Sequence, residues 1–320
     1  MTFSIILKGM AMGVAEAIPG VSGGTIAFIT GIYERLLAAI GGILGPKVVG
    51  ALRKEGIAPA FKAADGSFIL QLGVGMIIGL GMAIFSITEL LEAYPPVVWA
   101  FFFGLIISSA IYVARQIDRW SPTSLFLLVA GTAGAYFLTT INPMAGSTNL
   151  LFVFLAGVIA ISALILPGIS GSFILLLLGM YTVVFQAVRG LASGNLEQLI
   201  IVATFGLGCL IGLGLFSRVL SYTFKTYPNQ TLALLTGFML GSLNKLWPWR
   251  EVIQTRVNSA GEEVPFIDRP VAPAAYEVAT GEPSFLLTAI LALVAGLVIV
   301  FILDRFAPPE DEIDALEKNT

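Results

Sequence analysis

The sequence contains no histidine, a single cysteine and few charged residues. Histidine is the commonest metal ligand and general base, so its absence argues against a metal site and against phosphatases with a histidine nucleophile. One cysteine, Cys209, allows neither an internal disulfide nor a cysteine metal cluster. A serine nucleophile at Ser22 or Ser170 would have no evident base. We therefore expect a protein without a cofactor, a bound metal or an enzymatic activity.

Charged residues make up 12% of the 320 residues, whereas apolar residues make up 57%. A soluble domain usually carries about 25% charged residues. The net charge of −3 is spread over the loops without a basic face, so nothing suggests a nucleic-acid partner. Six windows of about 20 residues hold almost no charge, and each is long enough to cross a hydrocarbon core of about 30 Å. These features predict an all-α polytopic membrane protein.

The chain contains an internal repeat, and its clearest element is a proline-glycine-serine phrase. The stretch AEAIPGVSGGTIAFITGIYE at 15–34 returns as ALILPGISGSFILLLLGMYT at 163–182. A shift of 148 residues aligns these phrases, and a shift of 133 aligns four glycines of each half. The aligned glycines are Gly73, Gly75, Gly79 and Gly81 in the first half, and Gly206, Gly208, Gly212 and Gly214 in the second. The repeat divides the chain into halves at 1–141 and 149–304.

Each half is predicted to contain a re-entrant helical hairpin followed by three transmembrane helices. Because three crossings per half place the halves in opposite orientations, the fold is predicted to be an inverted repeat. The first half is expected to have its hairpin at about 4–44 and its spans at about 68–90, 96–114 and 122–141. The second is expected to have its hairpin at about 149–188 and its spans at about 199–220, 229–246 and 284–303.

The distribution of positive charge favours this topology. With both termini in the cytoplasm, twelve of the 17 lysines and arginines lie on the cytoplasmic side, as the positive-inside rule requires. If each broken segment crossed completely, the repeats would be parallel and Arg53, Lys54 and Lys62 would lie outside, which fits the rule less well. The polar loop 247–283 is then external, and its alternating valines could make a small hairpin. Residues 305–320 form a charged cytoplasmic tail.

The repeated phrase predicts a helix that stops and restarts inside the membrane. Proline lacks an amide hydrogen and glycine resists helix, while Ser22 and Ser170 stand where an N-cap serine would start the second arm. Unpaired backbone persists in a membrane only where protein buries it or it lines a polar cavity. Two restarting helices that meet from opposite faces would aim amide hydrogens at one anion. The candidate substrate-binding residues are Gly20, Ser22, Gly23, Gly24, Thr25, Gly168, Ser170, Gly171 and Ser172.

The alternative interpretation of the glycines is close helix packing, and we favour it for the aligned glycines at 73–81 and 206–214. Three ionisable residues also need an interpretation. Glu16, which Leu164 replaces in the repeat, is a candidate for a proton-linked role, or else a charge facing a water-filled vestibule. Glu34 is a second coupling candidate, although with Arg35 it also fits a charged membrane edge. Arg218 aligns with Phe85 and is a candidate phosphate-binding cation, unless it snorkels to the surface.

The phrases PGVSGGTIAFITGIYE and LPGISGSFILLLLGMY resemble a bacterial and archaeal membrane family of polyprenyl-phosphate transporters, the PopT type, over residues 1–305. The resemblance implies a flippase that returns undecaprenyl phosphate from the outer to the inner leaflet of the cytoplasmic membrane for cell-wall synthesis. It assigns the family motif to Glu16, Pro19, Gly20, Ser22, Gly23, Gly24 and Thr25, and to Pro167, Gly168, Ser170, Gly171 and Ser172. The coupling ion, proton or sodium, and any homo-oligomer stay open. From the residues alone, a transporter or channel for a small soluble anion remains an alternative.

Overall fold

The computed structural model describes residues 2–16, 22–43, 45–141, 143–144, 146–257 and 263–306. Pro19 and Gly20 lie outside the described residues, as does the tail from 307 onward. The described part is mostly helical, and several of its helices are long and apolar enough to cross a membrane. The prediction of a helical polytopic membrane protein is therefore confirmed.

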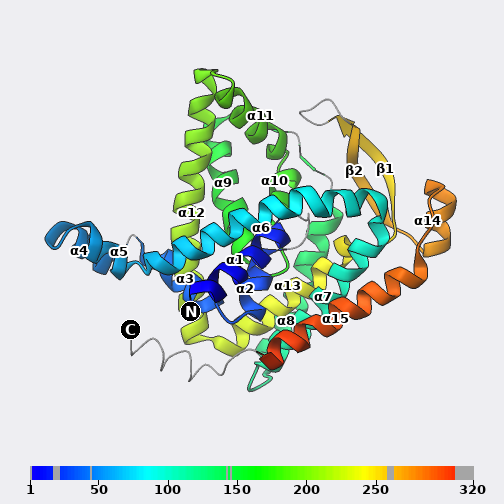
Figure 1. Cartoon of the computed structure of the whole chain (residues 1–320), viewed down its shortest axis with the longest axis horizontal. Coiled ribbons are helices and arrows are strands. Elements are labelled where there is room, and N and C mark those ends of the chain that lie inside the picture. Colours follow the sequence, from blue (N-terminus) through cyan, green and yellow to red (C-terminus); the bar gives the residue numbers. More distant parts are fainter. Residues whose placement is uncertain are drawn as a thin grey trace.

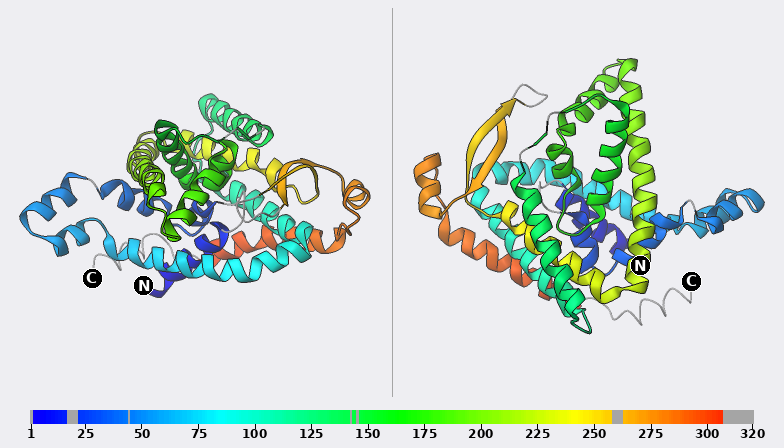
Figure 2. Two further views of the ribbon diagram at one scale, coloured as in Figure 1. Left: turned by 90° about the horizontal axis from the view of Figure 1, so that it is seen from above. Right: turned by 180° about the vertical axis from the view of Figure 1, so that it is seen from behind.

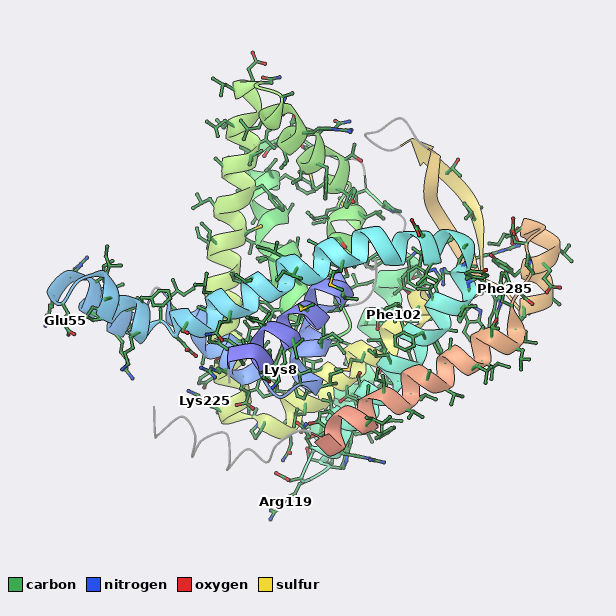
Figure 3. All side chains as sticks on the ribbon, in the orientation of Figure 1. Lys8, Glu55, Phe102, Arg119, Lys225 and Phe285 are labelled. Carbon is green, nitrogen blue, oxygen red and sulfur yellow. The ribbon has the colours of Figure 1, made fainter. Side chains whose placement is uncertain are left out.

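The first half of the chain is helical, and its first helix ends at Glu16 before a second begins at Gly23, at the predicted break (Figure 1). Helices α4 and α5 project from the body, and Glu55 lies at the far end of this projection (Figure 3). The elements are α1 (Thr2–Glu16), α2 (Gly23–Ile29), α3 (Tyr33–Gly42), α4 (Pro46–Lys54), α5 (Ile57–Ala63), α6 (Gly66–Ala93), α7 (Pro95–Arg115) and α8 (Pro122–Thr140).

The second half repeats this order, with a short 3-10 turn in place of α4 and α5 and with an inserted antiparallel hairpin. The hairpin lies in the polar loop, where the alternating valines allow it. The elements are α9 (Leu150–Ile165), α10 (Gly171–Leu177), α11 (Met180–Ala192), η1 (Leu196–Gln198), α12 (Leu199–Thr226), α13 (Pro228–Leu246), β1 (Arg250–Val257), β2 (Glu263–Pro270), α14 (Pro273–Thr280) and α15 (Leu286–Phe306).

Each broken segment contains a sharp bend directly after its short helix. Helices α2 and α3 meet at 119°, and α10 and α11 meet at 107°. The aligned glycines Gly31 and Gly179 stand at these two bends with φ values of +70° and +67°. Only glycine adopts this left-handed conformation without steric cost, so the repeat preserves the residue that the bend requires.

The aligned glycines pack helices together, as expected, at the positions that face another helix. A Cβ atom on Gly75 or Gly79 of α6 would lie 2.2 or 2.0 Å from a carbonyl oxygen of α1. On Gly208 or Gly212 of α12 it would lie 2.2 or 2.7 Å from a carbonyl oxygen of α9. The same close approach thus joins α1 to α6 and α9 to α12. The other four aligned glycines, Gly73, Gly81, Gly206 and Gly214, meet nothing within 4 Å.

Helix α13 differs from the other predicted spans. By length and composition, the apolar segments among the described residues are 66–83, 95–115, 122–140 and 196–226, the two bent pairs, and the shorter 150–165 and 286–302. The predicted span 229–246 is a helix of 19 residues, but it does not belong to this apolar set. It packs against both α7 and α8, and its buried residues include Thr231, Thr236 and Ser242. A helix enclosed by protein does not need the apolar surface that lipid demands.

Candidate functional site

The first helix break is closed by hydrogen bonds within the chain. Ser22 is the N-cap of α2, and its Oγ accepts from the Gly24 N–H at 3.1 Å, as the sequence predicted. The Gly23 N–H donates to Oε1 of Glu16 at 2.7 Å, and the Thr25 N–H donates to the Ser22 carbonyl at 3.0 Å. Every residue of α2 is buried. The carboxylate of Glu16 thus takes the place where an anion would bind this helix start.

The first break also contacts the second break directly. The Ser22 hydroxyl donates to the carbonyl of Leu166 at 3.0 Å or of Leu164 at 3.2 Å. In return, the Gly168 N–H donates to Oγ1 of Thr25 at 3.1 Å. A Cβ atom on Gly24 would lie 2.3 Å from the carbonyl oxygen of Ile165, so only glycine permits this approach. The two repeated phrases, 148 residues apart, therefore lie against each other.

The second break is likewise followed by a short helix and a sharp bend, but it lacks the hydrogen bonds of the first. Ser170 is the N-cap of α10 but makes no side-chain cap, and its Oγ is 2.8 Å from Oγ of Ser172. Leu164 lies over Gly171 as Glu16 lies over Gly23, since a Cβ atom on Gly171 would be 3.1 Å from the Leu164 Cβ. A leucine cannot accept a hydrogen bond. Across the described part of the chain, no atom accepts from the backbone N–H of Gly171, Ser172 or Phe173.

A pocket opens at the second break. Its empty volume is about 330 Å³, open solvent included. The polar residues on its wall are Ser170, Ser242, Thr139 and Lys245, and among the described residues that line it only Lys245 is charged. Residues 22–25 of the first break do not line it. The remaining lining residues are Ala135 and Leu138 of α8, Gly168, Ile169 and Phe173.

An ion cluster joins Lys245 of the pocket wall to the β-hairpin. The Lys245 ammonium lies 2.9 and 3.1 Å from the two carboxylate oxygens of Asp268 on β2. Arg250 on β1 donates to the same Asp268 at 2.9 Å and to the carbonyl of Asn244. Burial raises the pKa of Asp268, but the hydrogen bonds and charges of Arg250 and Lys245 outweigh it, so this pKa lies below its usual value. Asp268 is therefore ionised.

Three further predicted residues lie away from this pocket or outside the described chain. Arg218 is exposed on α12 and donates to the carbonyl of Gly41 at 2.9 Å, at the end of α3. Glu34 is exposed in the first turn of α3. Gly20 lies outside the described residues. The structure thus brings together Ser22, Thr25 and Gly168, places Gly168 and Ser170 on the pocket, and keeps Arg218 and Glu34 apart from it.

Sequence reasoning missed Lys245 and Asp268. The charge pattern places Lys245 only among the five basic residues of the outer side, and it predicts no chemistry for the loop 247–283 that contains Asp268. One signal was present, because Ser242 and Lys245 stand three residues apart and so share one helical face. The pairing of Lys245 with Asp268, 23 residues later, had no signal in the sequence.

Comparison with known proteins agrees with the resemblance of the repeated phrases. A family model described as undecaprenyl phosphate translocase-like matches residues 12–264. A polyprenyl-phosphate transporter of Vibrio cholerae serotype O1 is 43% identical over 304 residues, which cover 95% of this chain and 96% of that protein. A polyprenyl-phosphate transporter of Staphylococcus aureus is 33% identical over 255 residues, or 76% of this chain and 85% of that protein. No solved structure matches.

The match covers the first break, the second break, the pocket and most of the hairpin. The chain therefore belongs to the undecaprenyl phosphate translocase-like family.

Proposed function

We propose that this membrane protein transports a polyprenyl phosphate, undecaprenyl phosphate in particular, from the outer to the inner leaflet of the cytoplasmic membrane. The observation that carries the proposal is the pocket at the second break, whose lining residues include a lysine and three hydroxyl side chains, next to the start of α10. Each of these groups is a donor, and a phosphate monoester presents only acceptor oxygens. The relatives named as polyprenyl-phosphate transporters support the same substrate.

The phosphate lies in the pocket beside Ser170, and the polyprenyl tail stays outside in the lipid. An empty volume of about 330 Å³, open solvent included, is too small for a whole polyprenyl tail. Leu138, Ile169 and Phe173 provide apolar contacts for the first isoprene unit. Helix α8 forms one wall of the pocket, and its other face exposes Tyr136 and Phe137. In Figure 2 this helix lies at an edge of the molecule, where a tail can remain in contact with lipid.

The two breaks are re-entrant, the halves form an inverted repeat, and the hairpin lies outside the cell with both termini in the cytoplasm. In this topology the pocket faces the outer side, because Lys245 on its wall pairs with the external hairpin. Loading from the outer leaflet follows. Glu16 completes the cycle by holding the first helix start while the second is open, and its release, coupled to a proton, frees those N–H groups for the phosphate.

Reconstitution tests the proposed function. The purified chain in liposomes should exchange labelled polyprenyl phosphate between leaflets faster than protein-free vesicles do. A matched sample with labelled phosphatidylglycerol, a phosphodiester, should show no such acceleration. Labelled inorganic phosphate in the external medium distinguishes the alternative, because uptake of the free anion without lipid exchange would identify a transporter for a small soluble anion. Equal lipid exchange with and without the protein would refute the proposal.

A further inference from the structure

The charge at the mouth of the pocket is only half neutralised. Lys245 and Arg250 contribute two positive charges, and Asp268 is the one carboxylate that both of them contact. All three side chains are largely covered, with exposed fractions of 25%, 11% and 20% for Lys245, Arg250 and Asp268. The cluster therefore carries a net charge of +1 where solvent screening is weak. Such a cluster attracts an anion more strongly than the same charges would if they were exposed to solvent.

Arg250 can hold Asp268 without Lys245. Its guanidinium donates to Asp268 through Nη2 at 2.9 Å and to Asn244 through Nη1, so the hairpin and the end of α13 position it independently of the lysine. Its Nε is buried, and the described residues offer it no hydrogen-bond partner. A second bond to Asp268 at this Nε would make the contact bidentate, as arginine and carboxylate prefer.

Lys245, in contrast, is already directed toward the substrate side. Its side chain lines the pocket together with Ser170 and Ser242, and its ammonium lies 5.8 Å from the centre of the Phe173 ring on the same wall. A lysine is a point charge on a flexible stem, so it can change partner by rotating within the pocket. An arriving phosphate would meet this ammonium as the one charged group among the lining residues.

We propose that Lys245 is the headgroup-binding cation and that Asp268 of the β-hairpin is its exchangeable counter-ion. When phosphate enters the pocket, Lys245 transfers from Asp268 to the phosphate, and Asp268 stays with Arg250. The hairpin then serves to keep the lysine in place and to weaken binding of anything less charged than a phosphate monoester. A phosphodiester with a single negative charge competes less well with Asp268. This inference rests on the proposed function and deepens it by naming the residues that select the headgroup.

Concentration dependence of lipid exchange tests the inference on the full chain in liposomes. Lys245→Gln should raise the polyprenyl phosphate concentration for half-maximal exchange by about tenfold or more, as loss of a charged hydrogen bond does. Asp268→Asn should lower it several-fold, because the lysine no longer has a competing partner. Arg269→Gln is the matched control: it removes a positive charge from the adjacent hairpin position, which is more exposed and pairs with Glu251 instead of Asp268. The control should behave as wild type.

The opposite signs of the two substitutions separate binding from misfolding. A folding defect would impair exchange by both variants. A lower concentration for half-maximal exchange in Asp268→Asn therefore supports the exchange of partners, even if Lys245→Gln cannot be purified. An unchanged or raised value in Asp268→Asn, or a Lys245→Gln variant that matches Arg269→Gln, overturns the inference. Wild-type protein without exchange would instead overturn the proposed function itself. Competition by inorganic phosphate, with and without uptake of that ion, distinguishes recognition of the headgroup from transport of the free anion.

Discussion

The two helix breaks have the same sequence pattern, and each is followed by a short helix and a sharp bend, yet one is closed by hydrogen bonds and the other is not. At the first, Glu16 accepts from Gly23, and Ser22 caps Gly24. At the second, Leu164 occupies the matched place, and the matched N–H groups have no acceptor among the residues that the structure describes. The exchange of Glu16 for Leu164 thus accounts for the missing acceptor at Gly171, whereas Ser170 keeps the residue type of Ser22 but makes no cap. A carboxylate at the break accepts a hydrogen bond from the helix start, whereas a leucine cannot.

Leu164→Glu is the most severe test of this comparison. The new carboxylate would lie over Gly171 as Glu16 lies over Gly23, and it would repel a phosphate in the pocket. Like charges in close contact cost several kcal/mol, so lipid exchange should fall by roughly 100-fold or more. Leu164→Met, which keeps the side chain apolar, is the control and should retain exchange. Full activity of the glutamate variant in folded protein would show that the second helix start does not hold the phosphate.

Gly24→Ala tests the contact between the breaks. Its Cβ atom would lie 2.3 Å from the Ile165 carbonyl oxygen, so the backbones must move apart. Overpacking of this kind costs about 1–3 kcal/mol, and the melting temperature of the protein in detergent should drop accordingly. Gly73→Ala, on a helix face that meets nothing within 4 Å, should leave the melting temperature unchanged. Equal melting temperatures for the two variants would contradict the close approach.

Glu16→Gln tests the proton role of the first break. A glutamine oxygen can still accept from the Gly23 N–H, but it carries no charge and takes up no proton. A hydrogen bond to a charged group exceeds a neutral one by about 1 kcal/mol, so the exchange rate should change about fivefold. The part of the pH dependence that comes from Glu16 should also disappear, which leaves the titration of the phosphate itself. A pH profile like that of wild type would remove Glu16 from the coupling step, whatever the change in rate.

Ser22→Ala and Ser170→Ala give the smallest effects and should differ in kind. Ser22 caps α2 and bonds across to the second break, so its loss should lower stability by about 1 kcal/mol, measured as the melting temperature. Ser170 makes no cap, so its loss should raise the polyprenyl phosphate concentration for half-maximal exchange and leave stability nearly unchanged. If both variants lose stability equally, the two serines serve the same structural purpose, and the comparison fails at this position.

Much of the fold could be predicted because lipid and backbone chemistry constrain it locally. Low charge and long apolar windows indicated a polytopic helical protein, and proline with glycine indicated where helices stop. The N-cap at Ser22 and the packing of Gly75 and Gly208 followed from the same local rules. The surroundings of helix α13 were harder to predict, because its polar residues are buried in the packing with α7 and α8.

The candidate site was less predictable, because packing between residues far apart in the chain decides which side chains reach it. Ser170 and Gly168 stand on the pocket, but the cation on its wall is Lys245 rather than Arg218. Both are single positive charges near the end of a predicted span, and the sequence does not distinguish them. Only packing decides that Arg218 binds the end of α3 and that Lys245 faces the second break.

The sequence by itself determined the repeat, the two helix breaks and the glycine positions, because each depends on residues close together in the chain. The tertiary structure alone decided which break is closed, since that depends on where the Glu16 carboxylate reaches after the chain turns. It also decided the partnership of Lys245 with Asp268 and Arg250. Charges far apart in sequence acquire their roles from distance and burial, and the folded chain sets both.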